Sequence, residues 1–138
     1  MSPLRRTSHV TYNITYHFVI APKYRKGILK KGKREVLRSI IEKIAVEYQW
    51  YVEEMEIMED HVHILMSAPP RYSPAQTMQI MKSITAREMF ARFPELTKEL
   101  WAGELWADGY FVSTVGDDIT KDVIRKYIKY QRQQTFRF

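Results

Sequence analysis

Residues 58–67 read MEDHVHILMS, and the alternation inside this stretch decides the fold. From His61 onward, imidazole and apolar side chains take alternate positions, and alternate residues of a β-strand point to opposite faces of a sheet. His61 and His63 therefore share one face. The other face, expected against a hydrophobic core, carries Val62, Ile64 and Met66.

The segments before this strand give one helix signal between two strand signals. Residues 9–21 (HVTYNITYHFVIA) are rich in Thr, Tyr, Ile and Val, which predicts a strand. Between residues 33 and 48 the apolar side chains recur at steps of three and four, which is typical of an amphipathic helix. Residues 50–58 predict a second strand, which a turn at residues 58–60 joins to the strand that contains His61 and His63.

A second helix is predicted from the residues at its N-terminus. After the loop APPRYSP, Ser73 offers an N-cap, Pro74 suits the first helical position, and Gln76 completes a pattern that resembles a capping box. The helix is expected to end before Pro94, because proline disfavours helical backbone in the residue that precedes it.

The end of the chain adds one strand and one helix. Residues 95–109 are expected to be irregular, and residues 110–116 (YFVSTVG) predict a fourth strand. Asp117 or Asp118 would then cap a last helix over residues 119–134.

The order of these elements predicts an α+β fold in a single domain, residues 1–138. Strand, helix, two strands, helix and strand match the ferredoxin-like split βαβ arrangement, which RRM domains share. We therefore expect an antiparallel sheet with both helices on one face, followed by a C-terminal helix. The opposite face is left open for a cover or a ligand.

Composition limits the class of protein. The chain has 138 residues, of which 45% are apolar, and it contains no cysteine. The absence of cysteine excludes disulfides, thiolate metal sites and a cysteine nucleophile. No apolar run is long enough to cross a bilayer, and the N-terminus lacks the apolar stretch of a signal peptide. We expect a cytoplasmic protein with no membrane partner.

Positive charge gathers at both ends of the chain. Residues 1–34 hold nine Lys or Arg and no acidic residue, and residues 121–138 hold six basic residues beside Asp122 alone. Residues 35–120 hold seven basic and fifteen acidic residues. This clustering favours a polyanionic partner such as nucleic acid, while a role in solubility alone stays open.

The histidine pair has two interpretations. Two imidazoles on one face can bind one divalent ion, but a lone His-x-His is more often two partly exposed polar residues of a sheet. Two ligands leave a zinc site incomplete, and sequence spacing cannot place His9 or His17 beside them. Oxygen ligands with open positions would instead suit Mg²⁺ or Mn²⁺.

The last helix offers further candidate residues. Tyr127 and Gln131 are four positions apart and therefore lie on one helical face. Placed over the open face of the sheet, they could supply a phenol and an amide oxygen next to the metal. The alternative is an ordinary apolar stripe formed by Val123, Ile124, Tyr127 and Ile128.

Five segments in this order and spacing resemble the IS200/IS605-type transposases, the single-tyrosine (Y1) members of the HUH nuclease superfamily. The resemblance runs from about Tyr16 to Gln131. One departure is Glu59, where the family often has proline, and it alters a turn without touching the ligands. The segments are KYRKGIL (23–29), MEDHVHILMSAPP (58–70), MKSITAREMF (81–90), LWADGYFVSTVG (105–116) and YIKYQ (127–131).

The resemblance implies a ferredoxin-like enzyme that cleaves and rejoins single-stranded DNA at insertion-sequence ends. It implies that His61 and His63 bind a divalent metal, Mg²⁺ or Mn²⁺, with Gln131 as a third ligand. It also implies that Tyr127 is the nucleophile and forms a 5′-phosphotyrosine. The implied partners are DNA with end hairpins and a second copy of the chain, with active sites shared between the two subunits.

Contacts to DNA and rival functions complete the hypotheses. Lys23 and Arg25, which flank Tyr24, are the first candidates for DNA contacts, followed by Lys82 and Arg87. One rival is a domesticated relative that processes repeated palindromes. The other is a noncatalytic RRM-like module, although no segment matches the RNP1 pattern and His-x-His has no role in that scheme.

Overall fold

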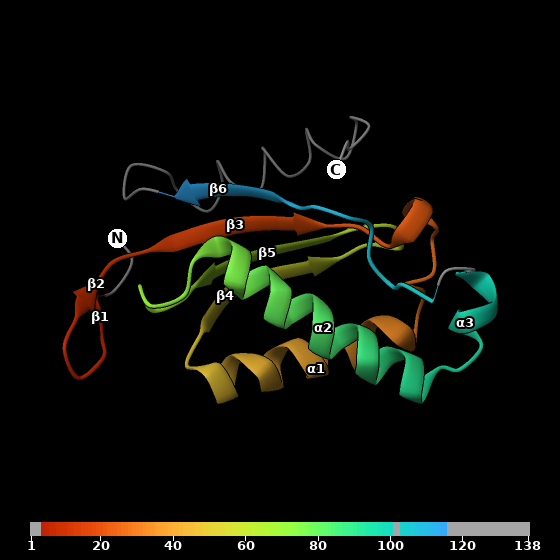
Figure 1. Cartoon of the computed structure of the whole chain (residues 1–138), viewed down its shortest axis with the longest axis horizontal. Helices are drawn as coiled ribbons and strands as arrows, with labels where there is room; N and C mark the ends of the chain where they lie inside the picture. The colour runs from red at the N-terminus through yellow and green to blue at the C-terminus, as the bar shows by residue number, and fades with distance from the viewer. Residues whose placement is uncertain (1–3, 101–102, 116–138) are drawn as a thin grey trace.

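The computed structural model describes residues 4–100 and 103–115 (Figure 1). The predicted last helix lies outside these residues, and so do Tyr127 and Gln131. The elements, in chain order, are β1 (Arg5–Arg6), β2 (Thr11–Tyr12), β3 (Thr15–Ile20), the 3₁₀ turn η1 (Lys23–Arg25), α1 (Lys33–Tyr48), β4 (Tyr51–Ile57), β5 (Val62–Ser67), α2 (Pro74–Arg92), α3 (Leu96–Glu99) and β6 (Phe111–Val115).

Strands β3, β4, β5 and β6 form a four-stranded sheet in the order β4–β5–β3–β6, and every neighbouring pair is antiparallel. Both long helices, α1 and α2, lie on the same side of this sheet (Figure 1). This topology is that of a ferredoxin-like fold. It confirms the predicted α+β class and leaves the second face of the sheet without a described helix.

The central strand β5 divides its side chains as the alternation predicts. Val62, Ile64 and Met66 are fully buried in the main hydrophobic core with residues of α1 and α2. On β3, Ile20 and Phe18 pair with Val62 and Ile64 and join the same core. The intervening residues of β5, including His63, therefore point to the opposite face.

Helix α2 begins as its sequence predicts. The Gln76 backbone N–H donates to Ser73 Oγ at 3.1 Å, and the Ser73 N–H donates back to Gln76 Oε1 at 2.8 Å. These two bonds are a capping box, with Pro74 as the first helical residue. The helix ends at Arg92, shortly before Pro94. Within the described parts of the chain, no helix combines the length and apolar character needed to span a membrane.

Two segments differ from the sequence prediction. The strand expected over residues 9–21 is interrupted, because Thr11–Tyr12 pairs with Arg5–Arg6 in a separate two-stranded sheet. Residues 95–109 are not wholly irregular, since Leu96–Glu99 forms a single helical turn that buries Leu96. The first difference is a short local hairpin and the second accompanies the burial of Leu96, and β-propensity alone identifies neither the partner strand nor the buried residue.

Candidate active site

Three imidazoles gather on the face of the sheet that α1 and α2 do not cover. Val19 of β3 lies opposite His63 of β5, so His17, two residues before Val19, shares that face. His61 stands just before β5. All three side chains are nearly inaccessible, with exposed fractions of 0% for His17, 5% for His61 and 1% for His63.

The rings of His61 and His63 are arranged so that both can approach one ion. Their centroids lie 4.8 Å apart and their planes are nearly perpendicular, at 87°. Histidine nitrogens bind zinc at about 2.0–2.1 Å, and similar distances hold for other small divalent ions, so two ligand nitrogens of one ion lie roughly 3 Å apart. The observed separation of the rings is compatible with that geometry.

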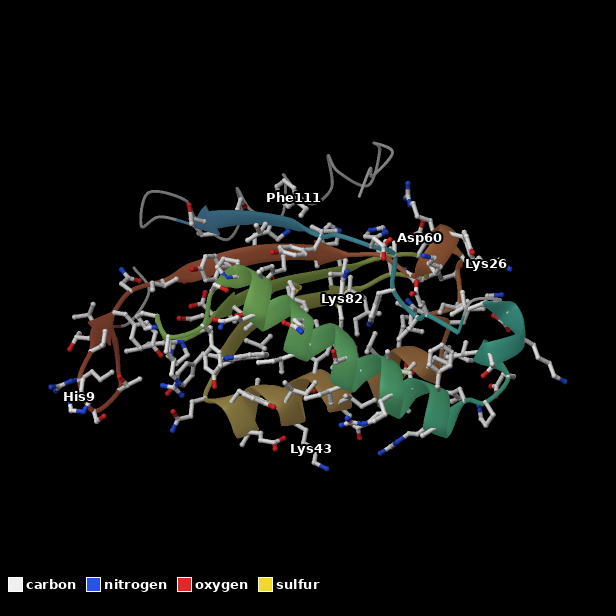
Figure 2. The ribbon with its side chains drawn as sticks, viewed as in Figure 1. His9, Lys26, Lys43, Asp60, Lys82 and Phe111 are labelled. Atoms are coloured by element: carbon white, nitrogen blue, oxygen red, sulfur yellow. The ribbon has the colours of Figure 1, made fainter. Side chains whose placement is uncertain are left out.

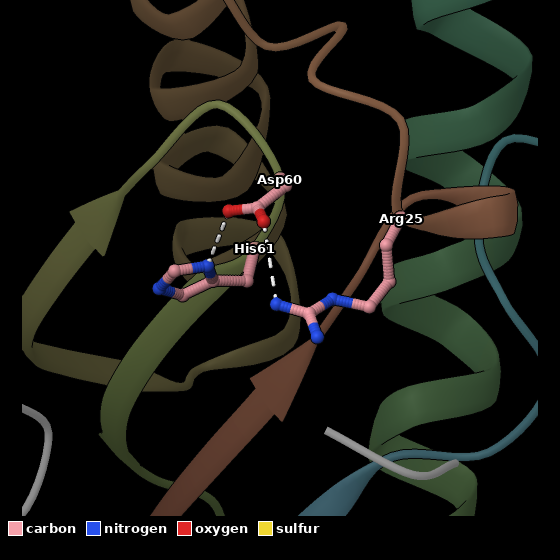
Figure 3. Close-up of polar contacts among 3 residues, drawn as sticks. All are labelled: Arg25, Asp60 and His61. Atoms are coloured by element: carbon pink, nitrogen blue, oxygen red, sulfur yellow. Dashed lines mark hydrogen bonds and ion pairs between the residues drawn. The ribbon is translucent and has the colours of Figure 1, made fainter. Parts of the chain in front are cut away.

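One ring nitrogen of His61 is held by a carboxylate. The Nδ1 atom of His61 donates to Asp60 Oδ1 at 2.7 Å, and Nη2 of Arg25 donates to Asp60 Oδ2 at 3.3 Å (Figure 3). An ionised carboxylate only accepts hydrogen bonds, so Nδ1 carries a proton, and in the neutral ring the lone pair is then on Nε2. A carboxylate behind a ligand histidine is the usual arrangement in metal sites, because it fixes the tautomer and the ring orientation.

His63 has a similar neighbour on β3. His17 Nε2 and His63 Nδ1 lie 3.4 Å apart within hydrogen-bonding geometry, and the two rings stack with planes 12° apart. Burial, with smaller effects from His61 and His17, lowers the pKa of His63 to about 3. Burial also lowers the pKa of His17 to about 4. Both rings are therefore neutral at pH 7, which is the form of imidazole that binds metals.

The described residues supply part of a metal site. Nowhere in residues 4–100 and 103–115 do three His, Cys, Asp or Glu side chains gather in a way that could hold an ion. His61 and His63 fit a divalent metal by their donor atoms, their spacing and the contacts that orient their Nδ1 atoms. A complete site would need at least one further ligand from elsewhere in the chain, from water or from a phosphate.

A polar cavity lies beside Asp60, the residue that contacts His61. It has a volume of about 470 Å³, within the range of small-ligand pockets, and lies between the start of α1 and the β4–β5 turn. Asp60 belongs both to this cavity and to the Arg25–Asp60–His61 chain of contacts, so Asp60 separates the space from His61. Its lining residues are Arg25, Gly27, Arg34, Met58, Glu59 and Asp60.

The predicted DNA-contacting cations lie in two different places. Arg25 is brought to the histidine site through Asp60, and Lys23 precedes it by two residues in η1. Lys23 Nζ donates to Glu104 Oε2 at 2.9 Å, and this bond raises the pKa of Lys23. Lys82 and Arg87 belong to α2, which packs on the other face of the sheet, so the structure does not bring them to His61.

Lys82 has a structural role. Its ammonium donates to the backbone carbonyls of Ala107 and Gly109 at 2.9 and 2.5 Å. Figure 2 shows its side chain rising from α2 toward the sheet. Burial lowers the pKa of Lys82, against a smaller raising effect of Asp108. The residue fixes the connection that leads into β6, whereas Arg87 is exposed.

We expect Lys82→Met to lower the free energy of unfolding by about 1.5–3 kcal/mol, because two carbonyls lose a charged donor. Urea denaturation monitored by circular dichroism measures the change. Arg87→Met, an exposed cation on the same helix, is the matched control and should stay within about 0.5 kcal/mol of wild type. Equal stability of the two variants would contradict the structural role of Lys82.

His17 is the residue that the sequence analysis left unplaced. His17 and His63 are 46 positions apart in the sequence, and they come into contact only because of the register of β3 against β5. The available signal was the strand pattern around His17, which places it on the same face as Val19. Phe111 of β6 also packs edge-on to His17, with ring centroids 5.7 Å apart, and points away from the helices (Figure 2).

Comparison with known proteins identifies the same family as the motifs do. The family model described as "Transposase IS200 like" matches residues 10–131. The ISDra2 transposase TnpA of Deinococcus radiodurans is 36% identical over 123 residues, which cover 89% of this chain and 87% of that protein. The transposase for insertion sequence element IS200 of Salmonella typhimurium is 32% identical over 134 residues, covering 97% and 87%.

Solved structures agree in fold. A crystal structure described as a transposase from Deinococcus radiodurans R1 aligns with a TM-score of 0.75 and 32% identity, covering 92% of this chain and 97% of that one. A REP-associated tyrosine transposase bound to a REP hairpin shares the fold, with a TM-score of 0.53 at 18% identity, covering 97% and 75%. The resemblance drawn from the sequence is confirmed, and the chain belongs to the IS200-like transposases of the IS200/IS605 type, a family of DNA-cleaving enzymes.

Proposed function

We propose that this protein is a single-strand DNA transposase that cleaves and rejoins insertion-sequence ends through a 5′-phosphotyrosine on Tyr127. The observation that supports it most directly is the histidine pair on the uncovered face of the sheet. In the neutral His61 ring, the hydrogen bond from Nδ1 to Asp60 makes Nε2 the metal-binding nitrogen, and His63 directs its Nδ1 toward His17 Nε2 on the same face. Two such rings are difficult to explain as ordinary surface residues, because both are buried.

The proposed metal site consists of His61, His63 and Gln131, and the ion is Mg²⁺ or Mn²⁺. When bound, the ion supplies positive charge that neutralises the scissile phosphate and the departing 3′ oxygen. Asp60 holds the His61 ring in the required tautomer, and Arg25 holds Asp60 (Figure 3). Gln131 lies outside the described residues and enters this site as a proposal from the family motif.

Tyr127 performs the covalent step. Its phenolic oxygen attacks the phosphorus in line with the departing 3′ oxygen, so an O–P bond forms to the tyrosine while the P–O3′ bond breaks. The phenol loses its proton as it attacks, because its ordinary pKa is near ~10, and the 3′ oxygen gains one. Attack by a different 3′-hydroxyl on the phosphotyrosine reverses these changes and joins two strands.

The proposed partners are single-stranded DNA with end hairpins and a second subunit. In this proposal Lys23 and Arg25 contact the DNA backbone near the histidines, and Arg87 contacts DNA from the helical side. Lys82 contributes indirectly by fixing the connection before β6. A homodimer with shared active sites, in which Tyr127 of one subunit serves the histidines of the other, is part of the same proposal.

The test is a covalent-adduct assay. The full chain is incubated with a single-stranded oligonucleotide that carries an end hairpin, with Mn²⁺ or Mg²⁺, and denaturing electrophoresis detects the protein–DNA adduct. We expect an adduct that EDTA prevents. Activity only on repeated-palindrome hairpins would favour the domesticated relative, whereas tight RNA binding with no adduct on any DNA would replace the nuclease by a binding module.

Asp60→Ala should weaken Mn²⁺ binding about 10- to 100-fold, because His61 loses the carboxylate that fixes its tautomer. Isothermal titration calorimetry measures the affinity. Glu59→Ala is the matched control, since it removes one carboxylate from the same turn and the same cavity without touching His61. Similar losses in both variants would indicate a general charge effect and would contradict the positioning role of Asp60.

A further inference from the structure

The turn η1 has an unusual backbone. Tyr24 adopts φ 61° and ψ 12°, and Arg25 follows with φ 53°. Two consecutive non-glycine residues in the left-handed region are uncommon, and such strain concentrates at functional sites. Glycine or asparagine would adopt this conformation with less strain, so the backbone itself gives no reason for a tyrosine at position 24.

Contacts of Pro22 and Lys23 hold the start of the turn against the segment around Trp106. The Lys23 backbone N–H donates to the Leu105 carbonyl at 2.8 Å, and Pro22 forms an isolated β-bridge with Trp106. Trp106 is itself fixed, since its Nε1 donates to Thr85 Oγ1 of α2 at 2.9 Å. The strained conformation is therefore imposed by the folded core.

The result is an exposed aromatic ring whose next residue, Arg25, is linked to the histidine site through Asp60. Tyr24 is 59% exposed, and the Lys23 ammonium lies 5.7 Å from its ring centroid. The next residue, Arg25, contacts Asp60, which contacts His61. By contrast Tyr51, the other strongly exposed aromatic residue of the described chain, is covered on one face by the guanidinium of Arg5 at 3.9 Å.

We propose that Tyr24 is a stacking platform for one unpaired base of the DNA strand cleaved at His61 and His63, with Lys23 contacting the adjacent backbone phosphate. Aromatic rings beside cations are the common way of holding single-stranded nucleic acid, because every base offers a π-face. The proposal rests on the proposed function, since it places this base next to the scissile phosphate. It assigns a nucleotide-binding role to a side chain that has no role in the hydrophobic core.

The test is binding without chemistry. The full chain is titrated in EDTA against a fluorescent single-stranded oligonucleotide that contains the hairpin and the cleavage site, and anisotropy gives Kd. We expect Tyr24→Ala to bind about 5- to 150-fold more weakly and Tyr24→Phe to bind like wild type. Tyr51→Ala, the matched exposed tyrosine, should have no effect.

Two further measurements separate stacking from damage to the turn. Tyr24→Gly relieves the backbone strain and should be at least as stable as wild type, yet bind as weakly as Tyr24→Ala. In an oligonucleotide scanned with single abasic sites, one position near the cleavage site should weaken wild-type binding by the same factor. That abasic effect should vanish in Tyr24→Ala, because base and ring form one interaction.

The outcomes distinguish this inference from the proposed function. Unchanged Kd for Tyr24→Ala, with a normal adduct in wild type, overturns the stacking platform and leaves the nuclease intact. A missing adduct in wild type, together with the expected losses for Tyr24→Ala and one abasic position, overturns the nuclease and retains the nucleotide subsite.

Discussion

Tyr127→Phe is expected to reduce the covalent protein–DNA adduct at least ~10³-fold while leaving the affinity for single-stranded DNA within about twofold of wild type. The substitution removes one oxygen atom, and that oxygen forms the proposed bond to phosphorus. The ring remains, so packing and any contact of the ring with DNA are retained. Denaturing electrophoresis measures the adduct, and anisotropy measures binding.

The chain offers a close control for this variant. Tyr130 stands three residues further along the same segment. Tyr130→Phe should form the adduct normally, and peptide mapping of the wild-type adduct should find the nucleotide on Tyr127. A normal adduct in Tyr127→Phe combined with its loss in Tyr130→Phe would move the nucleophile and refute the assignment.

The parts of the fold that the sequence predicted are those encoded locally. The alternation of His61 and His63 with apolar residues specifies the two faces of β5, because the strand period is two. The start of α2 was predictable because Ser73 and Gln76 satisfy each other's backbone groups within one turn. Neither feature depends on which distant segment packs nearby.

The parts that sequence analysis missed depend on pairing between distant segments. The contact of His17 with His63 requires the register of β3 against β5, and the contact of Arg25 with Asp60 joins residues 35 positions apart. The role of Lys82 could not be predicted from the sequence either. A helical lysine has the same sequence signal whether it faces DNA or satisfies buried loop carbonyls, and here it donates to two carbonyls.

His61→Ala and His63→Ala should each lower adduct formation by about 10²–10³-fold, since loss of metal charge stabilisation costs several kcal/mol in the transition state. Each variant should also lose measurable Mn²⁺ binding in calorimetry. His9→Ala is the control, because His9 is exposed outside the four-stranded sheet and should behave as wild type. Denaturation in EDTA separates metal loss from unfolding, and wild-type Mn²⁺ affinity in either variant would refute the ligand assignment.

The His61→Ala variant also tests whether the active sites are shared between subunits. Mixed dimers of His61→Ala and Tyr127→Phe subunits contain one intact site if the tyrosine of one subunit serves the histidines of the other. At equal concentrations half the dimers are mixed and each has one intact site of two, so adduct should recover to about a quarter of the wild-type yield. The DNA should attach to the His61→Ala subunit alone, because only that subunit retains Tyr127, and an affinity tag that changes its mass identifies it. Subunits that exchange freely without any recovery would show that each tyrosine acts on the histidines of its own chain.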